Sequence, residues 1–235
     1  MTVSISAEWG IPRSEVGIVL SAELIGMGFG SVILGGLADR MGRKPAILLC
    51  LVVGGLGMFL ASMASGVVDL TAWRFTTGLG IGGMLAAINA VTAECSNRKD
   101  RNLAVALMVI GYPVGAVLGG LVAAELLEVY SWRSMFVFGG IITVVCFPLV
   151  MFLMPETPAY YMATRRPGAL EKINKSLRSL RKPTISEMPA ETHVNEEDKP
   201  KISDLFRDPH LRTVTLLLSF GYMFHTITFY YILKW

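Results

Sequence analysis

The first 154 residues alternate between long apolar runs and short polar segments. The run from Val16 to Leu37 carries one charged residue, Glu23, and the run from Pro45 to Val68 carries none. An α-helix needs about 20 predominantly apolar residues to cross the roughly 30 Å hydrocarbon core of a bilayer. The pattern therefore predicts membrane-spanning helices joined by short polar turns.

Six spans can be delimited in this way along the 235 residues. They are predicted at Val16–Leu37, Pro45–Val68, Leu70–Thr92, Leu103–Leu126, Ser134–Met154 and Thr213–Leu233. The expected fold class is an all-α membrane protein. Its expected parts are an N-terminal helical bundle (1–154), a hydrophilic linker (155–212) and one further helix (213–235).

The linker is expected to have modest structure of its own. Within it, Ala169–Leu180 has the spacing of an amphipathic helix, and a short apolar piece at Ile202–Phe206 precedes Pro209.

Composition agrees with the membrane assignment. Hydrophobic residues make up 53% of the chain, charged residues 17%, and the mean hydropathy is +0.54, whereas soluble domains contain about 25% charged residues. The net charge is +3. The basic residues lie in loops and do not form a basic face with aromatic residues between them, so nucleic acid is not an expected partner. The scattered Cys50, Cys95 and Cys146 predict neither a metal site nor a disulfide framework and are interpreted as small buried hydrophobes.

The positions of lysine and arginine predict the orientation. Basic residues gather in the turn after the first span, in the loop after the third span, and in the linker, where eleven lie between Arg165 and Arg212. These three loops are expected in the cytoplasm. Residues 1–14 then fall on the outer face without a spanning helix before them, and Trp235 closes the chain beside a span. We therefore expect a fragment of a longer protein.

The turn between the first two spans packs four charges into six residues. Its sequence is Gly35-Gly36-Leu37-Ala38-Asp39-Arg40-Met41-Gly42-Arg43-Lys44. It resembles the signature loop of the major facilitator superfamily, G-x-L-A-D-R-x-G-R-[KR]. In that family the loop lies on the cytoplasmic side between the second and third helices and helps to control the switch between conformations. The alternative is a basic turn that only fixes topology.

This resemblance implies a partial major facilitator fold that covers the second to seventh of twelve helices. It also implies a set of conformational-switch residues in the turn: Gly35, Asp39, Arg40, Gly42, Arg43 and Lys44.

Arg74 lies about 7 Å inside the third span, where an arginine is unfavourable unless it faces protein or water. Together with Gly78 and Gly80 it resembles the superfamily motif R-x-x-x-G-x-G. In the family this motif is on a cavity-lining helix, and its arginine is linked to proton coupling or anion contact. The alternative is a snorkelling arginine paired with Asp69. The run also spells G-x-G-x-x-G through Gly83, but no strand precedes it, so close helix packing explains the glycines better.

Two further segments resemble family motifs. In the fourth span, Gly111, Pro113, Gly115, Gly119 and Gly120 resemble the fifth-helix motif G-x-x-x-G-[PA]-x-x-G-G, where the two bundles are thought to touch. Plain helix packing is the alternative for these glycines, and the proline is expected to favour a bend.

After the fifth span, Pro155–Tyr160 resembles P-E-[ST]-P-R-[WY] of sugar and organic-ion members, with alanine in place of arginine. The alternative is a helix stop followed by a helix start.

The last span carries His225 near the expected bilayer midplane, where an ionisable residue is a candidate functional site. Tyr222, His225 and Phe229 share one helix face. An imidazole beside aromatic rings suits a flat anionic substrate. The run H-x-x-T-F-Y-x-x-x-K-W is similar to that of the aromatic acid:proton symporters of the superfamily. A buried histidine bonded to a neighbouring helix is the alternative.

Three more polar residues lie within or at the ends of spans. Glu23 is a candidate carrier of a coupling proton or a substrate contact, with a hydrogen-bonded packing role as the alternative. Glu94 lies beside the basic inner loop and is expected to pair with a loop arginine. Asn89 is expected either to face a cavity or to hydrogen-bond between helices.

Together these features predict a proton-coupled secondary transporter that imports a small, 4-hydroxybenzoate-like aromatic carboxylate by alternating access. It would be a multi-pass protein of the bacterial inner (plasma) membrane, with the aromatic acid, the proton and membrane lipid as partners. The expected substrate and proton pathway is Arg74, His225, Tyr222, Phe229, Asn89 and Glu23. No nucleophile–base pair or phosphate loop is visible, so neither an enzyme nor a cofactor or metal is expected. The alternatives are a transport-inactive fragment and a sugar or drug carrier of the same superfamily.

Overall fold

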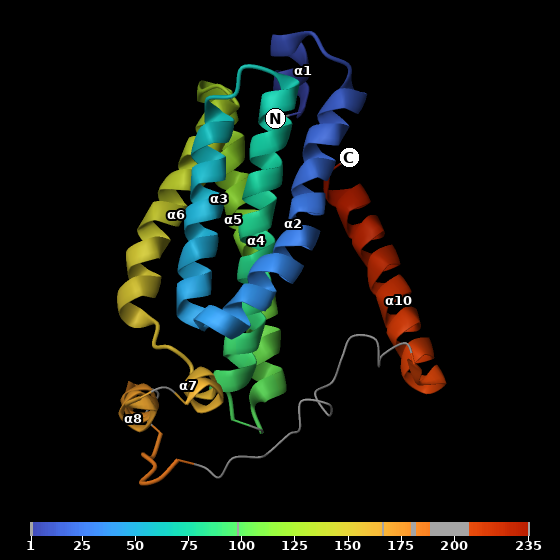
Figure 1. Ribbon diagram of the computed structural model, residues 1–235. Helices are drawn as coiled ribbons and strands as arrows, with labels where there is room; N and C mark the ends of the chain where they lie inside the picture. Colours follow the sequence, from blue (N-terminus) through green and yellow to red (C-terminus); the bar gives the residue numbers. More distant parts are fainter. Residues whose placement is uncertain (1, 98, 166, 180–181, 189–206, 235) are drawn as a thin grey trace. The chain divides into compact units, whose positions relative to one another are not determined.

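The computed structural model describes residues 2–97, 99–165, 167–179, 182–188 and 207–234, and the regular elements in these ranges are helices (Figure 1). Their bounds are α1 Thr2–Trp9, α2 Arg13–Met41, α3 Arg43–Ser62, α4 Val67–Cys95, α5 Arg101–Val129, α6 Arg133–Leu153, α7 Pro158–Thr164, α8 Ala169–Ser179 and α10 Pro209–Lys234. The all-α prediction is confirmed over the described residues.

Five of the described helices, α2 to α6, are long and apolar enough to cross a membrane. Each overlaps one of the predicted spans, and the sixth predicted span lies in α10. One boundary was placed wrongly. The second span was predicted to continue to Val68, but α3 ends at Ser62 and α4 begins at Val67. Apolar character alone could not reveal the turn between them, in which Ser65 donates its backbone N–H to Asp69 Oδ2 over 3.2 Å.

The chain divides into two compact units, residues 1–188 and 189–235. The first unit contains α1 to α8 and the second contains α10, and each is described by itself. The division falls inside the predicted linker, whose apolar piece at Ile202–Phe206 lies outside the described residues. The three-part domain division remains a prediction.

Helices α2 and α4 pack backbone against backbone. A Cβ atom placed on Gly26 or Gly30 of α2, or on Gly78 or Gly82 of α4, would lie between 2.0 and 2.3 Å from a carbonyl oxygen of the opposite helix. In each helix the two glycines are four residues apart, so both helices contribute a G-x-x-x-G stripe to the contact. Small residues at such positions allow helices to approach closely in a bilayer, where apolar burial gives little drive for association.

The opposite side of α4 approaches α3 almost as closely. A Cβ on Gly80 would lie 2.6 Å from the backbone nitrogen of Gly54 and 2.7 Å from the carbonyl oxygen of Cys50. Figure 1 shows α4 between α2 and α3, and α3 packs in turn on α6. The packing explanation of the third-span glycines is thereby confirmed.

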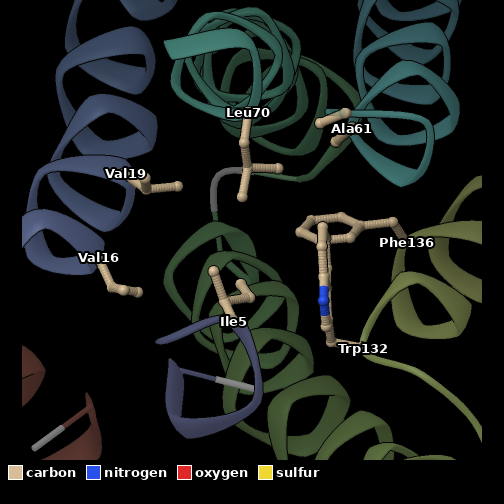
Figure 2. Close-up of a cluster of buried hydrophobic side chains, with 8 residues drawn as sticks. Ile5, Val16, Val19, Ala61, Leu70, Trp132 and Phe136 are labelled. Atoms are coloured by element: carbon tan, nitrogen blue, oxygen red, sulfur yellow. The ribbon is translucent and has the colours of Figure 1, made fainter. Parts of the chain in front are cut away.

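A cluster of buried apolar side chains closes the end of the first unit that carries α1, which is the predicted outer end (Figure 2). Its members come from α1, α2, α3, α4, α6 and the turns beside them: Ile5, Val16, Val19, Ala61, Ala64, Leu70, Trp132 and Phe136. Ile5 is 0% exposed, so α1 packs onto the bundle. The sequence analysis did not predict α1, because eight residues are too few for a helical pattern to stand out.

Polar contacts hold α1 on this cluster. Glu8 accepts a hydrogen bond from Trp132 Nε1 (2.6 Å) and pairs with Arg133 Nη1 (2.6 Å). Trp9 packs edge-on against Trp132, with ring centroids 5.4 Å apart. The hydrogen bond from Arg133, and after it that from Trp132, lowers the pKa of Glu8 below its ordinary value of 4.5.

We predict that Gly30→Ala destabilises the first unit, whereas Gly28→Ala on the same helix does not. The methyl group on residue 30 would collide with the backbone of Leu79, whereas no described atom of another element lies within 4 Å of a Cβ on residue 28. Overpacking of this kind costs about 1–3 kcal/mol, and alanine is otherwise the better helix former by about 1 kcal/mol. Thermal unfolding in detergent, followed by circular dichroism, measures both variants. Equal melting temperatures for the two would contradict the close α2–α4 contact.

We also predict an acid-sensitive attachment of α1. Because the pKa of Glu8 is lowered in the folded state, its stabilising contribution is present above about pH 4.5 and is lost as the pH falls through the lowered pKa. The near-ultraviolet circular dichroism of the Trp9–Trp132 pair should therefore weaken on acidification in the unmodified chain. Glu8→Gln should already show the weakened signal at neutral pH, without that acid transition. Glu15→Gln, which removes an exposed carboxylate of α2, is the control and should behave as the unmodified chain.

Candidate functional site

Arg74 of α4 and Glu23 of α2 form an ion pair within the membrane-spanning part of the first unit. Arg74 Nη2 contacts Glu23 Oε2, and the two side chains are only 12% and 14% exposed. The close approach of Gly78 to the backbone of Glu23 brings the helices near enough for this contact. Arg74 lies seven residues after the start of α4, which is about 10 Å along the helix axis.

Arg74 also contacts α6. Its Cζ atom lies 5.4 Å from the centroid of the Phe136 ring, within the range of a cation–π interaction. Its Nε is buried and has no hydrogen-bond acceptor in the described part of the chain. The expected alternative partner, Asp69, instead accepts the backbone N–H of Ser65. Since a guanidinium has five N–H donors, the site can offer hydrogen bonds to an anion in addition to Glu23.

Asn89 lies on α4 at a distance from this pair. Its Nδ2 donates to the carbonyl oxygen of Leu85 on its own helix (2.8 Å), and the side chain is exposed. Fifteen residues separate Asn89 from Arg74, or about 22 Å along the helix. The two residues therefore do not form one contact site within the first unit, and a cavity-facing role for Asn89 remains a prediction.

The aromatic and histidine positions of the last span belong to the second unit. α10 is continuous from Pro209 to Lys234, so Tyr222, His225 and Phe229 share one helix face as predicted. The side chains of His225 and Phe229 lie outside the described part of the structure. Their participation in a site with Arg74 remains a prediction.

The turn between α2 and α3 consists of a single residue, Gly42. Its φ of +106° is one that side chains rarely allow. A Cβ atom there would also lie 2.5 Å from Glu156 Oε2. Glycine is therefore required twice over, by the backbone conformation and by the carboxylate beside it. The predicted tight turn is confirmed.

Glu156, which follows α6, caps the amino end of α3. Its Oε1 accepts the backbone N–H of Arg43 (2.9 Å), and its Oε2 accepts that of Lys44 (3.2 Å). The first N–H groups of a helix have no partner within the helix, and a carboxylate suits the positive end of the helix dipole. The sequence analysis missed this role, although the resemblance of Pro155–Tyr160 to a family motif was a signal for it.

The side chain of Arg43 ties three helices together. Its Nη1 lies 2.7 Å from Asp39 Oδ1 at the end of α2, and its Nη2 lies 2.9 Å from Glu94 Oε1 at the end of α4. The predicted pairing of Glu94 with a loop arginine is thus confirmed. With Glu156, these contacts join α2, α3, α4 and the segment after α6 at the opposite end of the unit, which is the predicted inner end.

The other predicted switch residues lie around this network. The carbonyl oxygen of Arg40 accepts a hydrogen bond from the Tyr160 hydroxyl over 3.5 Å. A Cβ on Gly35 would lie 3.0 Å from the Cβ of Ala86, so α2 and α4 are still close at this level.

The glycines of the fourth span have no near neighbour in the described part of the chain. α5 runs unbroken through Pro113, and its residues are largely exposed. No described atom lies within 4 Å of a Cβ built on Gly111, Gly115, Gly119 or Gly120. The predicted close approach of another helix to this face remains a prediction.

The first part of the linker is more ordered than expected. The predicted amphipathic helix is present as α8, with Ile173 buried. Ser176 Oγ of this helix donates to the carbonyl oxygen of Glu156 (2.6 Å), and Lys182 Nζ contacts Asn97 Oδ1 in the loop after α4. Lys182 thus connects this part of the linker to the loop after α4, and Ser176 connects α8 to the segment after α6.

Comparison with known proteins assigns these features to one family. A sequence profile of the Major Facilitator Superfamily matches residues 1–234. The chain is 30% identical over 235 residues to the 4-hydroxybenzoate transporter PcaK of Pseudomonas aeruginosa, covering 99% of this chain and 52% of that protein. It is 28% identical to the gallate transporter of Pseudomonas putida, covering 99% and 51%.

A solved structure of the proton:xylose symporter XylE bound to 6-bromo-6-deoxy-D-glucose has a similar fold, with a TM-score of 0.67 and 19% identity. That match covers 77% of this chain and 44% of the symporter. The chain spans about half the length of the curated relatives it matches.

We predict that Glu156→Ala destabilises the inner end of the first unit by about 1–2 kcal/mol. The change removes the acceptor of two backbone N–H groups at the start of α3, and loss of a helix cap has a cost of this order. Thermal unfolding in detergent measures the effect. Glu171→Ala, which removes an exposed carboxylate of α8, is the control. A melting temperature equal to that of the control would contradict the capping role.

Proposed function

Because the chain belongs to the major facilitator superfamily of membrane transporters, we propose that it forms part of a proton-coupled carrier that imports a small aromatic carboxylate. The proposed substrate class is a ring carrying one carboxylate, with 4-hydroxybenzoate as the representative. The proposed location is the bacterial inner membrane. In this process no bond of the solute is made or broken, and the proton gradient drives accumulation.

The observation that carries the proposal is the Arg74–Glu23 pair. An arginine in a membrane-spanning helix is costly and marks a candidate site. The side chain of Arg74 is only 12% exposed, and it lies beside the ring of Phe136. A guanidinium binds a carboxylate through two parallel hydrogen bonds, and an adjacent aromatic ring favours a flat substrate.

The names of similar proteins support the same substrate class. The relatives described above transport 4-hydroxybenzoate and gallate, both of which are aromatic acids. The XylE likeness, at 19% identity, supports the fold and carries no argument about the substrate.

Two further groups of residues complete the proposal. Tyr222, His225 and Phe229 of α10 are proposed as further aromatic and imidazole contacts to the substrate. The inner-end network around Arg43 would stabilise one conformation of the carrier and would open in another, since all of its bonds cross between elements. Alternating access would follow from rocking of one helix bundle against the other.

The test is uptake of radiolabelled 4-hydroxybenzoate by cells that express these 235 residues alone, with and without a proton gradient. We expect gradient-dependent accumulation that excess unlabelled gallate reduces and excess xylose does not. Inhibition by xylose would favour the sugar-carrier alternative. Absence of uptake at normal membrane expression would favour the transport-inactive fragment.

We predict that Arg74→Gln reduces the apparent affinity for 4-hydroxybenzoate about 10- to 100-fold. A hydrogen bond to a charged group contributes about 1.5–3 kcal/mol, and each 1.4 kcal/mol is tenfold in affinity. Arg74→Lys should be intermediate, since lysine keeps the charge but not the planar pair of donors. Arg101→Gln, at the exposed start of α5, is the control. Unchanged affinity in Arg74→Gln, at a melting temperature matching the control, would contradict substrate binding at Arg74.

A further inference from the structure

We propose that the exposed side of α8 binds the headgroups of anionic phospholipids in the bilayer that the chain spans. The binding residues are Lys172, Lys175 and Arg178. The expected ligand is a lipid whose headgroup carries a net negative charge, with phosphatidylglycerol as the representative. This contact holds the first part of the linker at the predicted inner surface of the membrane. It goes beyond the proposed function, since it requires a bilayer and no transported solute.

The two sides of α8 have different surroundings. One side packs within the first unit, and its Ile173 is 0% exposed. The other side carries Lys172, Lys175 and Arg178, all of which are exposed. Each lies three residues after the one before, so the three share one surface of the helix, here called the basic face. Because the apolar side is already buried in protein, α8 has no apolar side left to insert into a bilayer, and its contact with lipid is electrostatic.

Hydrogen bonds hold α8 in one rotation about its own axis. Ser176 Oγ donates to the carbonyl oxygen of Glu156 over 2.6 Å. Asn174 exchanges two hydrogen bonds with Ile185: its Nδ2 donates to the carbonyl oxygen, and its Oδ1 accepts the backbone N–H, both over 2.9 Å. The basic face is therefore a fixed surface on the side that these contacts leave open.

The helix lies along the expected membrane surface. Figure 1 shows α8 nearly end-on, beyond the end of α6, whereas α2 to α6 run along the bundle, so α8 lies across the bundle axis. α6 remains apolar and exposed through its last turn, with Phe152 79% and Leu153 74% exposed. Exposed apolar residues of this kind suit the hydrocarbon region, which places the headgroup region next to the segment that follows α6.

Aromatic residues of α7 support this level. The rings of Tyr160 and Tyr161 lie with their centroids 5.6 Å apart, and tyrosine is enriched where the headgroups meet the hydrocarbon. Lys172 Nζ lies 5.9 Å from the centroid of the Tyr161 ring, within the range of a cation–π interaction. One end of the basic face is thus beside an aromatic residue that suits the membrane interface.

The charge of this region favours an anionic partner. Between Pro155 and Met188 the sequence contains seven basic and three acidic residues, and one of the three, Glu156, is engaged at the start of α3. Glu171 is exposed on α8 beside the basic face, so three basic groups and one carboxylate give a net charge of +2. Among the described residues, none of the three basic groups forms an ion pair.

The arrangement suits a membrane surface better than one small anion. Lys172 and Arg178 are six residues apart, which is about 9 Å along the helix. Ligands of a single phosphate converge on one point, whereas a row of basic groups matches a layer of many headgroups. Each lysine or arginine near an anionic membrane surface strengthens binding about fivefold.

The first experiment measures lipid binding to the purified 235-residue chain in detergent. Phosphatidylglycerol and phosphatidylcholine with the same acyl chains are titrated separately, and native mass spectrometry gives the apparent Kd of the first bound lipid. We expect a Kd at least about tenfold lower for phosphatidylglycerol, with a preference that falls as salt is added. Equal Kd values for the two lipids would overturn the inference.

The second experiment assigns the preference to α8. The variant Lys172→Gln/Lys175→Gln/Arg178→Gln should bind both lipids equally. The control, Lys99→Gln/Arg101→Gln/Arg212→Gln, removes the same charge from exposed positions elsewhere and should keep the preference. An equal loss in both variants would assign the preference to overall charge, and its persistence in the α8 variant would place it at another site. Either result would overturn the inference.

Single substitutions give effects of opposite sign. Glu171→Gln removes the carboxylate beside the basic face, so its Kd for phosphatidylglycerol should fall about fivefold, and that of Lys175→Gln should rise about fivefold. A change of the same sign in both, or no change in either, would contradict the inference. These two variants decide the question if the triple variant does not fold.

Two further results would reveal a different occupant. A lower melting temperature of the α8 triple variant in lipid-free detergent, relative to the matched control, would show that an acidic part of the chain covers the basic face. Displacement of phosphatidylglycerol by an equal concentration of inorganic phosphate would indicate a site for the free ion. Both results would overturn the inference. Neither depends on transport, so the proposed function stands or falls separately.

Discussion

The backbone contact between α2 and α4 determines much of what the first unit can do. Four glycines, two on each helix, bring carbonyl groups of one helix against the Cα atoms of the other. Side chains on adjoining turns then face one another at short range. This is why Glu23 and Arg74, which are 51 residues apart in the sequence, can form a direct ion pair within two apolar helices. A larger residue in the stripe would separate the helices and lengthen or break the Arg74–Glu23 contact.

Ion pairs between elements occur at three levels of the first unit. At the outer end Glu8 of α1 holds Arg133 of α6, in the middle Glu23 holds Arg74, and at the inner end Arg43 holds Asp39 and Glu94. A charge inside a bilayer is costly unless it is paired, so the middle pair also favours the placement of α2 beside α4. The middle pair differs from the others because Arg74 is an interior arginine whose buried Nε has no acceptor among the described residues.

The sequence predicted the spans, the tight turn after the first of them, the amphipathic helix in the linker, and the pairing of Glu94. Each of these features follows from a local pattern: the length of the apolar runs, the positions of glycine and charged residues, or the helical spacing of apolar residues in the linker. The sequence did not reveal α1, the cap that Glu156 provides to α3, or the choice of Glu23 as the partner of Arg74. Each of these depends on residues far apart along the chain, and Asp69 was the nearer candidate in sequence. The relation of Arg74 to His225 depends on how two units are arranged, which no local pattern specifies.

The one-residue turn at Gly42 has a mechanical consequence. Because the chain reverses within a single residue, no flexible connection separates the two helices. The carboxylate of Glu156 lies directly beside the turn. α2 and α3 therefore cannot move apart at this end without loss of the hydrogen bonds from the backbone of Arg43 and Lys44 to Glu156.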